Sequence, residues 1–230
     1  MKTGFRDGIA IGIGYFSVSF TFGIMAISFG FSWWQTVIIS MVNLTSAGQF
    51  AGIGIMAASG SYMEMLIAQL TINLRYSIMS ISLSQKVDRG FRGIFRWILG
   101  FGITDEIFAV AMSRNEMVSR GYFSGLLMMP YLGWTLGTLT GAICGEVLPS
   151  VVRDALGIAL YGMFIAILIP KIRVDRRIRC VAFIAVLMSC CFRYIPLLKG
   201  VSIGFAVTIC AIVASVIGAI LFPVNEEVEA

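Results

Sequence analysis

Long apolar stretches alternate with short polar ones along the whole chain. Most apolar stretches extend over ~17–25 residues, which is the length that a helix needs to cross a bilayer. The pattern predicts eight apolar segments, at about residues 8–29, 33–58, 61–84, 94–112, 121–145, 150–170, 178–195 and 200–222. We therefore expect an all-α fold, a polytopic membrane bundle of about seven or eight hydrophobic segments.

The composition agrees with this pattern. The chain is 58% hydrophobic and 13% charged, whereas a soluble domain is about half apolar and about a quarter charged. No composition shift or linker divides the apolar segments. We expect a single transmembrane domain over residues 1–224, followed by a short acidic tail at 225–230.

Several kinds of chemistry are excluded by what the sequence lacks. The chain has no histidine, which removes His-based nucleophilic catalysis and His metal sites. Its five cysteines show no C-x-x-C spacing, so we expect no metal site, no disulfide framework and no cofactor. It also has no G-x-x-x-x-G-K-[ST] loop, which excludes ATP hydrolysis by this chain. The net charge of +5 comes largely from short loops between apolar segments. Such loops are typical of cytoplasmic anchors, so no nucleic-acid partner is expected.

The basic loops set a constraint on topology. The loops at 86–96 and 171–179 should both be cytoplasmic, yet three apolar segments lie between them. One of the three therefore does not cross the membrane, and the short segment 94–112 is the candidate. The same argument from the basic N-terminus selects segment 33–58. Broken or re-entrant segments near the membrane midplane are how many transporters build their binding sites.

Segment 33–58 contains a stretch of small residues with two amides, Asn43 and Gln49. An unpaired amide in hydrocarbon costs free energy, so these side chains need a partner or a cavity. One interpretation is a substrate-binding site, formed by Asn43, Ser46, Gly48, Gln49 and Phe50 together with Asn73 from the polar face of the next segment. The other is close helix packing, because Gly48 and Gly52 form a small-xxx-small pair. Both stay open.

Charged residues inside apolar segments form a second candidate site. Asp105 and Glu106 lie deep in segment 94–112, and Arg75 lies inside segment 61–84. Intramembrane charges are costly and usually functional, so we expect an ion or proton coupling site. The alternatives are a salt bridge from Arg75 that only joins two helices, or an Arg75 side chain that snorkels to the interface.

Four glycines recur at every fourth position of segment 121–145, namely Gly133, Gly137, Gly141 and Gly145. They form one flat ridge, which is typical of helix packing at short distance. The partner helix can belong to this chain or to a second subunit.

Three short motifs occur in order: Ala47-Gly48-Gln49-Phe50, Asn73-Leu74-Arg75-Tyr76 and Thr104-Asp105-Glu106. In order and spacing they resemble the azaleucine-resistance (AzlC-type) permeases, the large subunits of branched-chain amino acid exporters. The resemblance covers nearly the whole chain. It implies a multi-pass protein of the bacterial plasma (inner) membrane that works with a small hydrophobic AzlD-type subunit. One departure is that residues 1–129 contain no proline, although the first segment of the family often does.

Together these observations predict a secondary transporter and not an enzyme. We expect it to export small amino acids, branched-chain ones foremost, coupled to an ion or proton gradient. Its partners would be the amino acid, the AzlD-type subunit and the lipid bilayer. Two alternatives remain: an intramembrane enzyme that uses Asp105 and Glu106 as an acid-base pair, and a membrane assembly subunit that transports nothing.

Overall fold

The computed structural model describes residues 1–91, 93–147, 149, 151, 165, 168–170, 172–198 and 200–223. These residues form helices joined by loops, which confirms the all-α class. The chain divides into two compact units, Met1–Ile53 with Asn73–Leu160, and Gly54–Ile72 with Tyr161–Ala230. Most of the predicted segment 150–170 and the whole tail 225–230 lie outside the described residues. The single transmembrane domain over 1–224 stays a prediction.

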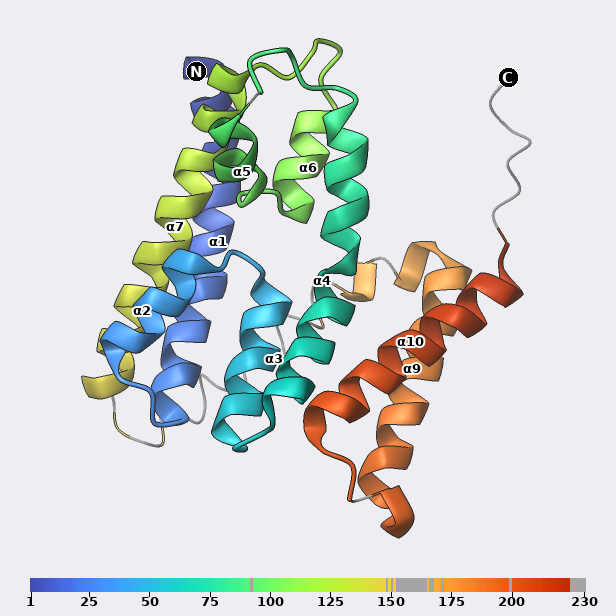
Figure 1. The fold of residues 1–230 in the computed structure, drawn as a ribbon. Coiled ribbons are helices and arrows are strands. Elements are labelled where there is room, and N and C mark those ends of the chain that lie inside the picture. Colours follow the sequence, from blue (N-terminus) through green and yellow to red (C-terminus); the bar gives the residue numbers. More distant parts are fainter. Residues whose placement is uncertain are drawn as a thin grey trace. The chain divides into compact units, whose positions relative to one another are not determined.

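Most predicted segments correspond to single helices in Figure 1: α1 (Lys2–Ser28), α4 (Tyr62–Ser84), α7 (Arg120–Val147), α9 (Arg176–Tyr194) and α10 (Ile203–Leu221). In the described part of the chain, three helices are long and apolar enough to cross a membrane. They are Lys2–Ser28, Arg120–Val147 and Gly204–Leu221. The total of seven or eight segments stays a prediction.

The two segments singled out by the charge pattern are both broken. Segment 33–58 forms α2 (Trp33–Val42) and α3 (Ser46–Ala57), with a break at 43–45. Segment 94–112 forms α5 (Ile94–Gly100) and α6 (Asp105–Met112), with a break at 101–104. The prediction of one or two broken segments therefore agrees with the structure.

The frame of the first unit is the pair α1 and α7, which lie side by side in the same direction (Figure 1). The glycine ridge of α7 faces α1: a Cβ at Gly133 would collide with the backbone of Gly12, and one at Gly141 with the backbone of Phe20. Small residues permit this short distance between two backbones. The partner helix of the ridge is thus α1 of the same chain.

The hairpin of α2 and α3 starts at the end of the unit where α1 finishes. Its tip reaches the middle of the frame, where Leu44 is buried in one cluster with Tyr15 and Trp134. The chain then turns back, and the ring of Phe50 packs edge-on against Phe22 further along α1, with 5.4 Å between centroids. This part of α3 therefore returns towards the end from which the hairpin came.

The hairpin of α5 and α6 starts at the opposite end. Before it, Phe91 packs against Phe123 near the start of α7, with 5.7 Å between ring centroids. Its tip reaches the same middle level, where Thr104 bonds with Tyr15. Ala111 of α6 then lies in a buried cluster with Phe123, so the chain has returned. We call Tyr15 and the two breaks, at 43–45 and 101–104, the central junction.

Both hairpins are shaped by local sequence. The backbone N–H of Ser32, the N-cap of α2, donates to Oε1 of Gln35 at 3.0 Å, which supports the start of this helix. Oδ1 of Asn43 accepts bonds from the backbone N–H and the hydroxyl of Thr45, at 2.9 and 2.7 Å, so the first break is a turn closed by a side chain. Gly93, with φ of 60°, precedes α5 in a conformation that suits glycine.

The loops that flank the second hairpin lie beside the N-terminus. The backbone of Gly125 in α7 closely approaches that of Met1, and the N–H of Asp88 donates to the carbonyl of Val118 at 3.1 Å. The N-terminus and the first basic loop are therefore at one end of the unit, as the charge pattern predicts for two cytoplasmic segments.

In the second unit, α9 and α10 pack in opposite directions, with Val181 near the start of α9 against Gly218 near the end of α10. The buried carboxylate of Glu64, in the first turn of α4, accepts a hydrogen bond of 2.7 Å from the backbone N–H of Gly204. It thereby satisfies a donor at the start of α10.

Candidate functional site

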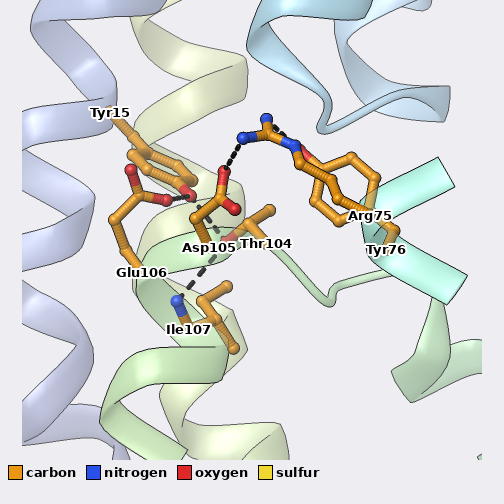
Figure 2. A network of polar contacts seen from close by, with 7 residues as sticks. All are labelled: Tyr15, Arg75, Tyr76, Thr104, Asp105, Glu106 and Ile107. Atoms are coloured by element: carbon orange, nitrogen blue, oxygen red, sulfur yellow. Dashed lines mark hydrogen bonds and ion pairs between the residues drawn. The ribbon is translucent and has the colours of Figure 1, made fainter. Parts of the chain in front are cut away.

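The central junction is organised around the side chain of Tyr15. This residue is 8% exposed, and its ring packs edge-on against Trp134 with 5.4 Å between centroids. Its hydroxyl oxygen lies 2.6 Å from Oγ1 of Thr104 and 2.5 Å from Oε2 of Glu106. Figure 2 shows the phenol pointing from α1 towards the start of α6. Tyr15 therefore ties the frame of the unit to the second break.

The proton pattern of this contact follows from counting donors. A phenol has one proton, and an ionised carboxylate only accepts. All bonds are made when Tyr15 donates to Glu106 and Thr104 donates to Tyr15. Oγ1 of Thr104 also accepts from the backbone N–H of Ile107 at 3.4 Å, as the N-cap of α6. The three side chains thus form one directed chain of hydrogen bonds that ends on Glu106.

The neighbouring carboxylate has a different partner. Oδ2 of Asp105 lies 2.8 Å from a guanidinium nitrogen of Arg75, and the two side chains are 40% and 45% exposed. The same guanidinium donates to the hydroxyl of Tyr76 at 3.3 Å (Figure 2). The salt bridge considered from the sequence is therefore present, and the two adjacent carboxylates point to separate partners. Whether they couple transport to an ion stays a prediction.

The first break carries a second polar network. Gln49 is 2% exposed; its Nε2 donates to Oγ of Ser40 at 3.0 Å, and its Oε1 accepts from Nε1 of Trp134 at 2.8 Å. The Ser40 hydroxyl in turn bonds with that of Thr138 at 2.7 Å. A buried amide with both ends paired is stable in an apolar surrounding. This network joins α2, α3 and α7 next to the junction, since Trp134 also packs against Tyr15.

The other predicted site residues lie at different depths around the first break. Asn43 and Ser46 are half-buried at its two ends, and Gly48 is buried in the first turn of α3. Phe50 is buried one turn further, against α1. Asn73 is half-buried on α4, two residues before Arg75. The structure thus brings Arg75, Asp105 and Glu106 to one break and puts Asn43, Ser46, Gly48 and Gln49 at the other.

Sequence reasoning missed the residues that connect the two networks. Tyr15 contacts Glu106 through its hydroxyl and Trp134 through its ring, while Trp134 donates to Gln49. Ser40 and Thr138 were not singled out either. A usable signal was present, since a Tyr or Trp inside an apolar run needs a partner for its polar atom. The identity of that partner depends on contacts far apart in the chain.

The two short helices that begin at the junction have different N-termini. The first turn of α6 carries two acids, Asp105 and Glu106, which complement the positive end of its dipole. The first turn of α3 carries none. The backbone N–H groups of this first turn, which begins at Ser46, lie at the positive end of the α3 dipole. The junction therefore pairs a helix end suited to an anion with a carboxylate pair suited to a cation.

Comparison with known proteins gives consistent matches. A family profile described as "AzlC protein" matches residues 10–148, which is more than half of the chain and includes both breaks. The chain is 31% identical over 175 residues to an "Uncharacterized membrane protein" of Archaeoglobus fulgidus, covering 74% of this chain and 76% of that protein.

Two further relatives have informative names. The chain is 28% identical over 175 residues to "Inner membrane protein YgaZ" of Escherichia coli, covering 73% of this chain and 71% of the relative. It is 26% identical over 173 residues to "Branched-chain amino acid transport protein AzlC" of Bacillus subtilis, covering 74% and 67%. No solved structure matches the chain. These matches and the apolar helices establish a membrane protein.

Proposed function

We propose, since this chain belongs to the AzlC family, that it is a secondary transporter that moves small amino acids across the membrane. We propose further that it exports them, that branched-chain amino acids are the preferred substrates, that an ion or proton gradient drives export, and that a small AzlD-type membrane subunit works with it. The name of the Bacillus subtilis relative supports the substrate class. The observation that carries the proposal is the central junction, where the tips of two hairpins from opposite ends of the unit meet at Tyr15.

The junction offers complementary partners for a zwitterion. The substrate carboxylate would bind the N–H groups at the start of α3, near Ser46 and Gly48, because that helix end has no acid of its own. The substrate amine would bind Asp105, which is 40% exposed and therefore reachable. To do so the amine competes with Arg75, so binding would loosen the ion pair between α4 and α6.

The remaining predicted residues would shape the pocket. The half-buried amides of Asn43 and Asn73 can orient the substrate by hydrogen bonds. Phe50 would give apolar contact to a branched side chain where it borders the pocket. Gln49 has both ends of its amide paired within the protein, so a direct contact with substrate would replace one of these bonds.

Glu106 would be the proton-coupling group. Its carboxylate accepts from the Tyr15 hydroxyl, and a protonated carboxyl would itself become a donor. Protonation would therefore reverse the direction of the chain of hydrogen bonds. Glu106 would donate to Tyr15, Tyr15 would donate to Thr104, and the Thr104 hydroxyl would turn to another acceptor. This gives a gradient a direct route to the contact that joins α1 and α6.

The experiment uses the purified chain in proteoliposomes, with and without a small AzlD-type subunit from the same source. We expect counterflow of labelled leucine, strongest with both subunits, and acceleration by a pH step. Export at full rate by the single chain would remove the subunit from the proposal. Chemical conversion of leucine would mean an enzyme, and absence of both conversion and counterflow with both subunits present would refute transport.

A further inference from the structure

A cavity of about 800 Å³ extends from the second break, where Phe101 and Ile103 line it, towards the end of the first unit that carries the N-terminus. It is lined by the last turns of α4, the basic loop after it, α5 and the second break. Its inner wall is apolar and includes Leu83, Leu99 and Phe123. Two arginines, Arg89 and Arg96, lie on its rim. The transport mechanism above makes no use of this space.

Two other basic groups at this end are already engaged within the protein. Lys86 donates to the backbone carbonyls of Met112 and Arg114, and the guanidinium of Arg120 stacks over the ring of Phe95 at 3.8 Å. Among the residues that the structure describes, neither Arg89 nor Arg96 forms an ion pair.

One acid also lines the cavity. Asp88 has its Oδ1 bonded to the backbone N–H of Gly90 at 2.8 Å, so that oxygen is already engaged. With Arg89 and Arg96 on the rim, the charged groups of the cavity sum to a net positive charge. Arginine binds phosphate oxygens well because its planar fork matches their geometry. The rim therefore complements a phosphate group.

The cavity also opens along the apolar outside of the unit. Trp97 is 80% exposed and Ile81 is 64% exposed, and both line the cavity. On α4, Ile81 continues a row of exposed apolar side chains with Leu74 and Ile78. In a membrane protein such a row faces hydrocarbon, and an exposed Trp is typical of the interface with the headgroups. A ligand held here can thus extend from the charged rim into the lipid.

We propose that this cavity binds an anionic glycerophospholipid of the surrounding leaflet, with the phosphate between Arg89 and Arg96 and an acyl chain along Leu83, Leu99 and Ile81. The charge pattern puts this end of the unit on the cytoplasmic side, where anionic headgroups attract basic groups of membrane proteins. The size of the cavity and its opening to hydrocarbon fit a lipid better than a single amino acid.

The test measures lipid binding to the full-length purified chain by native mass spectrometry, with phosphatidylglycerol and phosphatidylcholine as probes. Wild type should prefer phosphatidylglycerol, and Arg89→Gln/Arg96→Gln should weaken its binding by about tenfold or more. Ser84→Phe, which keeps both arginines and fills part of the cavity, should weaken it as well. The control Arg176→Gln/Arg179→Gln removes the same charge from the first turn of α9, in the second basic segment, and should stay within about twofold of wild type.

Three outcomes would overturn the proposal. One is equal affinity of the wild type for the two lipids, and another is unchanged phosphatidylglycerol binding in both cavity variants. The third is competition by soluble glycerol 3-phosphate as strong as that by the lipid, which would make the cavity a site for free phosphates. Leucine counterflow by wild type is measured on the same preparations, so a failure of lipid binding is distinguishable from a failure of transport.

Discussion

The hydroxyl of Tyr15 lies 2.5 Å from Oε2 of Glu106, although 91 positions separate the two residues in the chain. This contact joins the midpoint of a long frame helix to the first turn of a short one. Glu106 belongs to the acidic pair, and the ring of Tyr15 packs against Trp134, which donates to Gln49. The contact therefore connects the acidic pair with the buried network around Gln49.

Tyr15→Phe should impair transport while preserving the fold. The substitution keeps the ring against Trp134 and removes only the hydroxyl between Thr104 and Glu106. Hydrogen bonds to charged groups contribute about 1.5–3 kcal/mol, so we expect leucine counterflow to fall about ten- to hundredfold. The matched control is Tyr122→Phe, which removes a similar bond to Asp7 at the end of the frame. If both variants transport equally well, the Tyr15 hydroxyl has no role in transport.

Glu106→Gln and Asp105→Asn should each cripple transport while the protein still enters the membrane. The first variant keeps the shape next to Tyr15 but cannot exchange a proton, and the second cannot pair with an amine or with Arg75. We expect Arg75→Asp/Asp105→Arg, which keeps an ion pair between α4 and α6, to fold normally without restoring counterflow. Full, still proton-dependent export by Glu106→Gln would make the acidic pair purely structural.

Gln49→Ala should lower stability and weaken substrate binding together. It leaves Nε1 of Trp134 without its acceptor in a buried place, and an unpaired buried donor costs about 1–3 kcal/mol. Asn73→Ala should weaken binding with little loss of stability, because the residue is half-buried. Measuring leucine affinity and melting temperature on both variants separates the roles. Normal affinity in a destabilised Gln49→Ala protein would limit Gln49 to packing.

Gly141→Ala should prevent normal packing of α1 on α7. An added Cβ meets the backbone of Phe20, which cannot rotate away as a side chain would. We expect a marked loss of folded, monodisperse protein. Gly14→Ala in α1 is the control, since a Cβ there has no neighbour within 4 Å. This variant should be neutral or stabilising by up to about 1 kcal/mol, because alanine favours the helix. Equal yields of the two variants would contradict the packing described for the ridge.

Cysteine labelling tests the second hairpin. Single cysteines at Arg89, Glu116 and Arg176 should all react from the cytoplasmic side with an impermeant maleimide. The first two positions flank α5 and α6, and a hairpin that returns leaves both on one side. The third is the first residue of α9, in the second basic segment. Labelling of Arg89→Cys and Glu116→Cys from opposite sides would mean that the segment crosses the membrane completely.

Local pattern determined a large part of this protein. Apolar length alone placed most helices within a few residues, because burial in hydrocarbon demands helices of a given span. Two basic loops on the cytoplasmic side need an even number of membrane crossings between them. This requirement selected both broken segments, since basic loops are retained on that side of the membrane. The free-energy cost of a polar or charged side chain in apolar surroundings identified Gln49, Arg75, Asp105 and Glu106 as candidates, because each of them needs a partner.

The partners themselves were decided only by the tertiary structure. In the sequence, Gln49 and Glu106 are both polar residues within apolar segments. In the structure, Gln49 is hydrogen-bonded between Ser40 and Trp134, whereas Glu106 accepts from Tyr15. Likewise the glycine ridge that ends at Gly145 predicted close helix packing, but the sequence did not identify α1 as the partner helix. Sequence spacing fixes which residues share a face of one helix. Contacts between segments that are far apart in the chain depend on how all the helices pack together, and a local sequence pattern does not predict that packing.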